Sequence, residues 1–254
     1  MIGKAAMPTP GLSFCMMVKD EERDLATCLD SVRDLAGELI VVDTGSTDRT
    51  RDIAAEYGAE VMPFDFTIVD FAAARNHAIG RAKRRWILML DADETLDRAS
   101  APMVEKIVAE DQNAGFFLER YNHSAAQENP FTDYVVRLFP NRPDYRYRGR
   151  VHETVDASIL AGGGKLIQSA VRIDHRFAAD RDARRRKNYR YIEILREEIA
   201  ADFARSVPRS SRRRPNSAGV GPFSLVAPLP PRSGKILVRS ATVNVASCSF
   251  LSRI

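Results

Sequence analysis

The chain has 254 residues, 44% of them hydrophobic and 28% charged, which is the composition of an ordinary folded protein with a sizeable core. No apolar run approaches the roughly 18 residues that a membrane-spanning helix needs, and residues 1–11 lack the apolar stretch of a signal peptide, so we expect a cytoplasmic protein.

The formal net charge of +4 arises entirely at the end of the chain. Residues 205–254 hold nine of the 38 basic residues and none of the 34 acidic ones, so residues 1–204 carry a net charge of −5. A mildly acidic body offers no surface that would track a phosphate backbone, and we predict no nucleic-acid binding.

The first part of the chain alternates between short apolar runs and helical patterns. The expected strands are 11–18, 39–42, 59–64 and 86–90, and the expected helices between them are 19–35, 48–57 and 70–83. Strands that alternate with helices in this way imply parallel βαβ units and an open sheet with helices on both faces. In such sheets, ligands bind at the carboxyl ends of the strands.

Cys15 and Cys28 fall in a strand and a helix of this pattern, where we expect them to be small core residues. Together with Cys248 they are too few and too scattered for a disulfide framework or a zinc site.

After residue 97 the rhythm changes. We expect a helix over 99–110, an antiparallel pair of strands over 115–120 and 134–139, and a further strand over 165–174. A long charged helix is predicted over 178–205, with an apolar stripe made of Tyr191, Ile194, Leu195 and Ile199.

From about residue 206 the sequence becomes rich in Ser, Pro and Arg. Such a composition usually cannot bury enough apolar surface to fold. Two interpretations stay open: a disordered tail, or a natural C-terminal part that has been replaced, for instance through a shifted reading frame.

The acidic segment Asp91-Ala92-Asp93-Glu94 follows the apolar run 86–90. Two carboxylates two positions apart at the end of a buried strand can both face a hard cation such as Mg²⁺ or Mn²⁺, which prefers oxygen ligands and bridges readily to diphosphate oxygens. The cation would neutralise the charge that develops on a departing nucleotide diphosphate. An Asp-x-Asp pair alone is a common pattern, and an acidic solvated loop is the alternative.

Asp43 and Arg75 strengthen that interpretation. Asp43 ends the run 39–42, so we expect it at the neighbouring strand end, where its carboxylate can accept a hydrogen bond from a nucleobase or a ribose hydroxyl. The alternative is a role in the turn, since Asp-Thr-Gly-Ser is good turn chemistry. Arg75 lies in a helix of small residues, from which it can reach a phosphate or a base; the alternative is a surface charge.

Four segments together resemble family 2 glycosyltransferases with a GT-A fold, and they occur in the family's order and at fitting spacings. They are SFCMMVKDEE (13–22), IVVDTGSTDRT (40–50), DFAAARNHA (70–78) and WILMLDADE (86–94). Their form is most similar to the bacterial branch that includes lipopolysaccharide-core and peptide glycosyltransferases.

The resemblance implies a sugar transfer that inverts the anomeric carbon, a UDP-sugar or similar donor, and a divalent cation, Mg²⁺ or Mn²⁺, held by Asp93. It also implies that Asp43 contacts the nucleobase, Arg75 the nucleotide, and Asp91 the ribose or the sugar, with Ala92 beside it in the donor site.

By the same resemblance, the end of the first strand around Val18, Lys19 and Glu21 lines the base pocket.

The acceptor side of the site is expected further along the chain. Arg150-Val151-His152-Glu153 resembles a Gly-x-x-His-Glu segment found in this branch. Inversion needs a general base beside the acceptor hydroxyl, and Glu153 is the first candidate, with Glu94 or Asp97 in reserve. His152 is predicted to bind the metal or orient substrate, the alternative being a structural histidine.

His175 and the Arg-rich stretch 181–190 also fit this branch. A basic helix there can receive an anionic acceptor, although a solvated helix face is the alternative.

The predicted fold is therefore α/β: a GT-A-like open, mostly parallel sheet flanked by helices, with a small antiparallel acceptor-side part and a C-terminal helix. We divide the chain into an N-terminal extension (1–10), a nucleotide-sugar-binding half (11–98), an acceptor-side half with the C-terminal helix (99–205) and the basic tail (206–254). The predicted acceptor is a saccharide, a lipid-linked group or a peptide, and the protein is expected to make peripheral contact with the inner membrane surface.

Two rival functions stay open. A nucleotidyltransferase would carry a Gly-rich, basic loop after its first strand, where this chain has Lys19-Asp20-Glu21-Glu22, and dinucleotide-binding and P-loop signatures are missing as well. A catalytically inactive protein that only binds a nucleotide sugar is the second rival.

Overall fold

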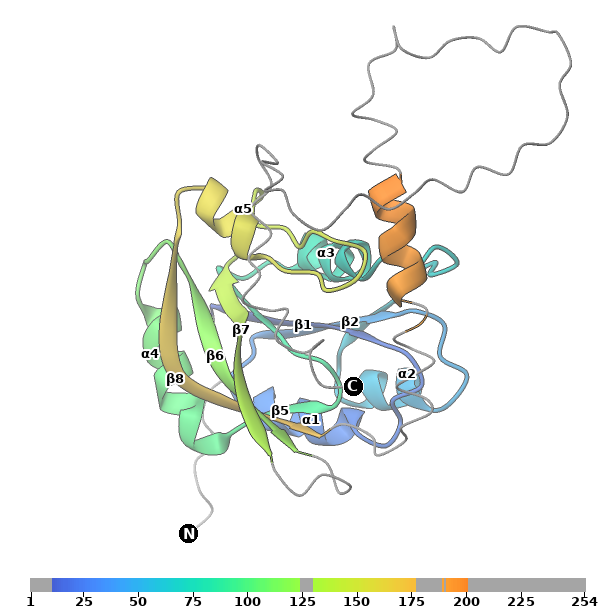
Figure 1. Cartoon of the computed structure of the whole chain (residues 1–254). Helices are drawn as coiled ribbons and strands as arrows, with labels where there is room; N and C mark the ends of the chain where they lie inside the picture. The colour runs from blue at the N-terminus through green and yellow to red at the C-terminus, as the bar shows by residue number, and fades with distance from the viewer. Residues whose placement is uncertain (1–10, 124–129, 177–188, 190, 201–254) are drawn as a thin grey trace, which may run out of the picture. The chain divides into compact units, whose positions relative to one another are not determined.

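An eight-stranded sheet organises the part of the chain that this computed structural model describes, which comprises residues 11–123, 130–176, 189 and 191–200 (Figure 1). Its strand order is β3-β2-β1-β4-β7-β6-β8-β5. The strands are β1 Leu12–Val18, β2 Glu38–Asp43, β3 Glu60–Pro63, β4 Trp86–Met89, β5 Glu94–Leu96, β6 Ala114–His123, β7 Phe131–Pro140 and β8 Lys165–Arg176. The helices are α1 Leu25–Val32, α2 Thr50–Glu56, α3 Phe71–Arg81, α4 Ala101–Ala109 and α5 Asp156–Ala161, with a 3-10 turn at Arg98–Ser100.

The first four strands are parallel and are joined by helices, as the sequence pattern predicts. The chain starts in β1, winds outward to β2 and β3, and then returns to β4 on the other side of β1. The expectation that Asp43 and Asp91 end neighbouring strands is therefore wrong by one strand, because β1 pairs with both β2 and β4. The reversal of winding lies between β1 and β4, and such a switch point is where open α/β sheets bind their ligands.

The second half of the sheet combines both strand directions. β6 and β7 form the expected antiparallel pair, β7 also pairs antiparallel with β4, and β8 runs parallel to β6. β5 and α5 were not anticipated, since segments of three and six residues are too short to show a periodic pattern. β5 matters for the site because its pairing with β8 sets Glu94 opposite His175.

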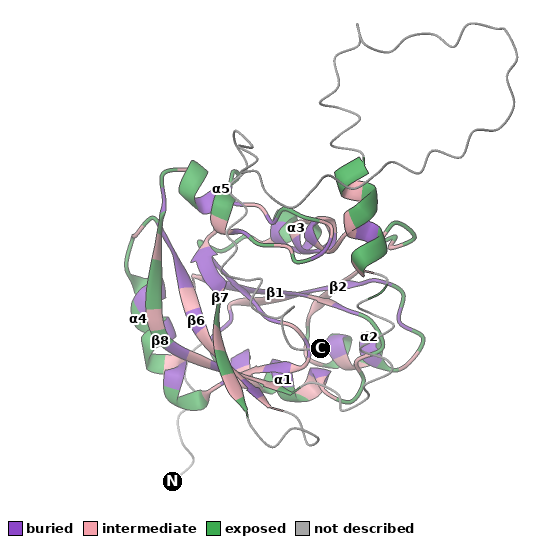
Figure 2. Cartoon of the chain, viewed as in Figure 1, coloured by how far each residue is buried: buried purple, intermediate pink, exposed green. Residues whose placement is uncertain are grey.

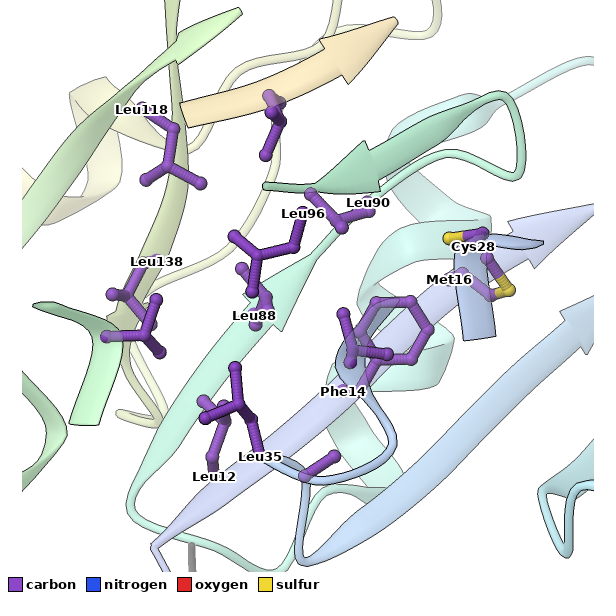
Figure 3. Packing of buried hydrophobic residues seen from close by; sticks show 14 of the residues in the cluster. Leu12, Phe14, Met16, Cys28, Leu35, Leu88, Leu90, Leu96, Leu118 and Leu138 are labelled. Carbon is purple, nitrogen blue, oxygen red and sulfur yellow. The ribbon is translucent and has the colours of Figure 1, made fainter. Parts of the chain in front are cut away.

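The core lies on both faces of the sheet, and Figure 2 shows that β1 and β2 are buried along most of their length. Leu12, Phe14 and Met16 of β1 point to one face, where α1, α2 and α4 pack, whereas Cys15 points to the other face, which α3 and α5 cover. Figure 3 shows part of the first cluster, in which side chains of β1 and β4 meet those of α1. Burial on both faces explains why these strands read as continuous apolar runs.

The two described cysteines are core residues, as expected. Cys15 and Cys28 are both fully buried and free, and burial raises the pKa of both thiols, which keeps them protonated. Cys248 lies outside the described residues.

The predicted C-terminal helix is described only at 189 and 191–200, where the chain is helical. Within its apolar stripe Ile194 is buried, but Ile199 is 69% exposed. The remainder of the helix, its Arg-rich stretch, the N-terminal extension and the tail all lie outside the described residues. None of the helices in the described part combines the length and the apolar character that crossing a membrane requires.

Candidate active site

Two loops at the carboxyl edge of the sheet are bound to each other by reciprocal hydrogen bonds. The backbone N–H of Asp20 donates to Ser46 Oγ (2.9 Å) and that of Glu21 donates to Thr50 Oγ1 (2.7 Å). In return, the backbone N–H of Thr47 donates to Asp20 Oδ1 at 2.7 Å. The loop after β1 and the loop after β2 therefore form one rigid rim. Glu21, one of the predicted base-pocket residues, is half-buried in this rim.

Asp43 ends β2 in this rim and is only 3% exposed. Its carboxylate accepts the backbone N–H groups of Ser46 (3.1 Å) and Gly45 (3.3 Å), and Gly45 adopts a φ of +103°, a conformation that favours glycine. Asp43 thus stabilises the turn that follows β2, which is the alternative role considered from the sequence. A contact between Asp43 and a nucleobase stays a prediction. Val18 is buried and contributes its carbonyl, which accepts hydrogen bonds from Thr44, while Lys19 is exposed.

Asp91, two residues beyond β4, lies between two guanidinium groups. Arg75 Nη2 donates to its Oδ1 and Arg137 Nη2 to its Oδ2, both at 2.7 Å. Burial alone would raise the pKa of Asp91, but Arg137 and Arg75 hold it well below its usual range. Each carboxylate oxygen of Asp91 therefore accepts a hydrogen bond from an arginine, although a third of the side chain remains exposed.

Arg75 joins Asp91 to the predicted general base. Its Nε donates to Glu153 Oε1 at 2.7 Å, and its side chain is 5% exposed and stacks over the ring of Tyr147. The small side chains of α3, among them Ala72 and Ala74, let this helix lie close against the sheet, so that Arg75 points inward. The surface-charge alternative for Arg75 is wrong, and a direct contact with the nucleotide stays a prediction.

The loop that carries Glu153 is anchored on two sides. The backbone N–H of Phe71 donates to the carbonyl of Arg150 (2.9 Å), and Arg150 Nε donates to the carbonyl of Val69 (2.9 Å). Arg150 Nη1 also pairs with Glu197 of the helical segment 191–200 at 2.9 Å. These anchors and the bond to Arg75 fix Glu153, whose side chain is 12% exposed.

The two reserve candidates for the base have structural roles. Glu94 is fully buried, accepts the backbone N–H of Asp91 at 3.0 Å, and pairs with Arg137 (3.1 Å) and Arg120 (3.2 Å). Asp97 accepts the backbone N–H of Ala99 and caps the 3-10 turn. A carboxylate enclosed like Glu94 cannot reach an acceptor, and the role of Glu153 as the base stays a prediction.

From Glu94 a chain of polar contacts crosses the β6–β7 pair. Arg120 binds both carboxylate oxygens of Asp133, the residue opposite it in the register, at 2.9 and 2.6 Å. Asn122 Nδ2 donates to Asp133 Oδ1 at 2.9 Å, and Asn122 Oδ1 lies 2.7 Å from His175 Nδ1. His175 Nε2 then lies 3.2 Å from Asp93 Oδ2. The network thus runs without a break from Glu153 to Asp93.

The structure pairs Asp93 with His175 rather than with His152. The side chain of Asp93 is 34% exposed, and Ala92 beside it is buried. His152 is exposed, has a φ of +53°, and sets its ring edge-on against Tyr191 at 5.7 Å between centroids. Within the described ranges no group of three or more His, Cys, Asp or Glu side chains is arranged to hold a metal.

Sequence reasoning missed the residues of β6 and β7 in this network. The one available signal was a charged residue, Arg137, inside the otherwise apolar run that became β7. Arg120, Asn122 and Asp133 gave no signal, because their pairing depends on the register of two strands.

Comparison with known proteins agrees with this fold. A TPR repeat-containing protein of Synechococcus elongatus is 45% identical over 150 residues, which are 59% of this chain and 36% of that protein. The SPbeta prophage-derived glycosyltransferase SunS of Bacillus subtilis is 27% identical over 152 residues, which are 57% of this chain and 35% of that protein. The matched region thus spans about a third of the length of these curated relatives.

Among solved structures, S. aureus TarS 1-349 in complex with UDP-GlcNAc superposes with a TM-score of 0.51 at 14% identity, over 66% of this chain and 58% of that one. This likeness shows that the fold is of the GT-A kind, as predicted. The family model described as glycosyl transferase family 2 matches residues 13–176. The chain belongs to glycosyl transferase family 2.

We predict that Arg137→Met lowers the free energy of unfolding by about 3 kcal/mol or more. The substitution removes a cation from a buried ion network and leaves the buried charge of Glu94 with Arg120 as its remaining ion-pair partner among the described residues. Urea unfolding followed by circular dichroism measures this change. The matched control is Arg81→Met, which removes an exposed pair with Glu60 and should cost less than about 1 kcal/mol. Equal losses in the two variants would contradict a structural role for the network.

Proposed function

We propose that this protein transfers a sugar, with inversion, from a UDP-sugar to a saccharide, lipid-linked or peptide acceptor, and that the transfer depends on a divalent cation. The observation that carries the proposal is the position of Arg75, which bridges Asp91 and Glu153 at the carboxyl end of β4. One guanidinium thereby fixes the distance between a donor-side carboxylate and an acceptor-side carboxylate. Family membership supports the reaction class.

Asp93 and His175 are the residues that would hold the cation. Two neighbouring ligands of an octahedral Mg²⁺ or Mn²⁺ stand about 3 Å apart when each bond is about 2.1 Å long. Asp93 Oδ2 and His175 Nε2 are 3.2 Å apart, so the pair fits two such positions. When bound, the cation supplies positive charge for the diphosphate oxygens. His152 takes no part in this proposal, since its ring packs on Tyr191.

The donor nucleotide would lie in the rim formed by the loops after β1 and β2. There Val18 lies directly opposite Asp43 in the register of β1 and β2, and Lys19 and Glu21 follow Val18 in the loop after β1. Because these loops are already bound to each other, they need little reordering when the nucleotide arrives.

Glu153 would act as the general base. The acceptor oxygen attacks the anomeric carbon while the bond from that carbon to the diphosphate oxygen breaks, and the acceptor proton passes to a Glu153 carboxylate oxygen. The electron pair of the broken bond leaves with the nucleoside diphosphate. Arg75 Nε donates to one of the two carboxylate oxygens of Glu153 and so holds the side chain in place. The other carboxylate oxygen can accept the proton.

Contact with the inner face of the cytoplasmic membrane belongs to the same proposal, because lipid-linked acceptors reside there.

The first test of the activity is hydrolysis of a panel of nucleotide sugars by the purified full-length chain, with Mn²⁺ and with EDTA. Release of UDP that requires Mn²⁺ supports the transferase. Binding without turnover would favour an inactive nucleotide-sugar-binding protein, and pyrophosphate-dependent formation of a nucleoside triphosphate would favour a nucleotidyltransferase.

Asp93→Ala should abolish the Mn²⁺-dependent part of UDP-sugar binding, because it removes the only carboxylate of the proposed cation pair. Calorimetry with UDP-GlcNAc in Mn²⁺ and in EDTA measures the effect. Asp97→Asn is the control, since Asp97 serves as a cap a few residues further along. Unchanged affinity in Asp93→Ala would show that the cation is held elsewhere.

Glu153→Gln should retain UDP-sugar binding and lose transfer by about 10²- to 10⁴-fold, which is the usual contribution of a general base. Glutamine keeps the size of the side chain and an oxygen for Arg75. The control is Glu56→Gln, which alters only an exposed partner of Arg49 at the end of α2. Normal turnover in Glu153→Gln would place the base on another residue.

A further inference from the structure

Asn122 occupies the point where the buried network reaches the cation pair. It lies on β6, is only 2% exposed, and contacts three groups at once. Its Nδ2 is 2.9 Å from Asp133 Oδ1 and 3.1 Å from the carbonyl of Arg120, and its Oδ1 is 2.7 Å from His175 Nδ1.

The neighbours of Asn122 determine which way its amide points. A backbone carbonyl, such as that of Arg120, can only accept hydrogen bonds. Partial burial alone would raise the pKa of Asp133, but Arg120 and Asn122 lower it, so Asp133 is a carboxylate and also only accepts. The NH₂ group of Asn122 must therefore face Asp133 and Arg120, and its oxygen must face His175.

This orientation in turn determines the tautomer of His175. The amide oxygen of Asn122 can only accept, so His175 Nδ1 must carry a proton. A neutral imidazole holds a single proton, which leaves a lone pair on Nε2. That lone pair faces Asp93 Oδ2 at 3.2 Å, so two electron-pair donors stand side by side. Such a pair attracts a shared positive charge, which either a proton or a metal cation can supply.

We propose that Asn122 is a positioning residue that holds His175 in the Nδ1–H tautomer, so that His175 Nε2 and Asp93 together present two ligand atoms to a divalent cation. This inference rests on the proposed function, because it assumes that the pair binds the cation. Without Asn122, His175 can adopt the other tautomer and donate Nε2–H to Asp93, which closes the pair to a metal. Partners of this kind, which bind metal ligands from behind, typically contribute 10- to 100-fold in metal affinity.

An asparagine is well matched to this position because the site needs a donor and an acceptor on one short side chain. A carboxylate at 122 would face Asp133 at hydrogen-bond distance, and an apolar residue would leave both Asp133 and His175 without this partner. Through Asp133 and Arg120, the same residue links the cation pair to Glu94 and so to the buried ion network.

The experiment compares the full-length protein with Asn122→Leu, in which a side chain of similar size lacks polar atoms. Two-bond ¹⁵N–¹H spectra at about pH 8.5, where an imidazole is neutral, report the tautomer of each of the four histidines. His175→Gln identifies the His175 signal. Binding of Mn²⁺ alone, followed by electron paramagnetic resonance, measures the affinity of the pair.

We expect His175 to be the Nδ1–H tautomer in the metal-free wild-type protein and to lose this preference in Asn122→Leu, with Mn²⁺ binding about 10- to 100-fold weaker. Asn141→Leu is the matched control. Asn141 also donates to two backbone carbonyls, those of Ala82 and Arg84, but just beyond the far end of β7. Its loss should reduce stability without changing the tautomer or the Mn²⁺ affinity.

An Nε2–H tautomer in the wild-type protein would overturn the inference, whether or not the Leu variant folds. So would unchanged Mn²⁺ affinity in a folded Asn122→Leu protein. The proposed cation pair fails separately: if Asp93→Ala leaves Mn²⁺ affinity unchanged, the pair does not bind the metal, even where the tautomer is the expected one.

Discussion

Asp91 holds the site together because one of its carboxylate oxygens pairs with Arg75 and the other pairs with Arg137. Two guanidinium groups that are almost fully buried need anionic partners, and Asp91, Glu94 and Glu153 supply them. The elements that meet here, namely α3, the loop after β4, β5, β7 and the loop before α5, are thus tied by charge as well as by packing. Buried ion pairs of this kind contribute little net stability against an apolar replacement, so their value lies in fixing geometry.

A consequence is that the two aspartates of the Asp-x-Asp segment have different surroundings. Asp91 is held from within by arginines, whereas Asp93 faces a histidine and keeps a comparable exposed fraction. The pairing of β5 with β8 contributes to this difference, because it brings Asp93, whose carbonyl accepts the backbone N–H of Arg176, beside His175. One carboxylate is therefore suited to anchoring the site, and the other to binding a cation.

The acceptor side is organised around the anchored loop that bears Glu153. This loop is held by α3 through Phe71 and by the segment 191–200 through Glu197, and the rings of Phe71, Tyr191 and His152 stand edge to face. The position of the base thus depends on a helical segment some forty residues further along the chain. That dependence ties the geometry of the candidate base to sequence beyond residue 176, where the family match ends.

The sequence by itself determined the α/β fold, the strand ends at Asp43 and Asp91, and the candidate residues Arg75, Asp93 and Glu153, because apolar periodicity and short motifs are local properties of a chain. Only the tertiary structure decided which of these residues meet. That β1 separates β2 from β4, that Arg75 bridges Asp91 and Glu153, and that His175 rather than His152 stands beside Asp93 all follow from strand order and register. Order and register arise from contacts between residues far apart in sequence, and these leave no local pattern to read.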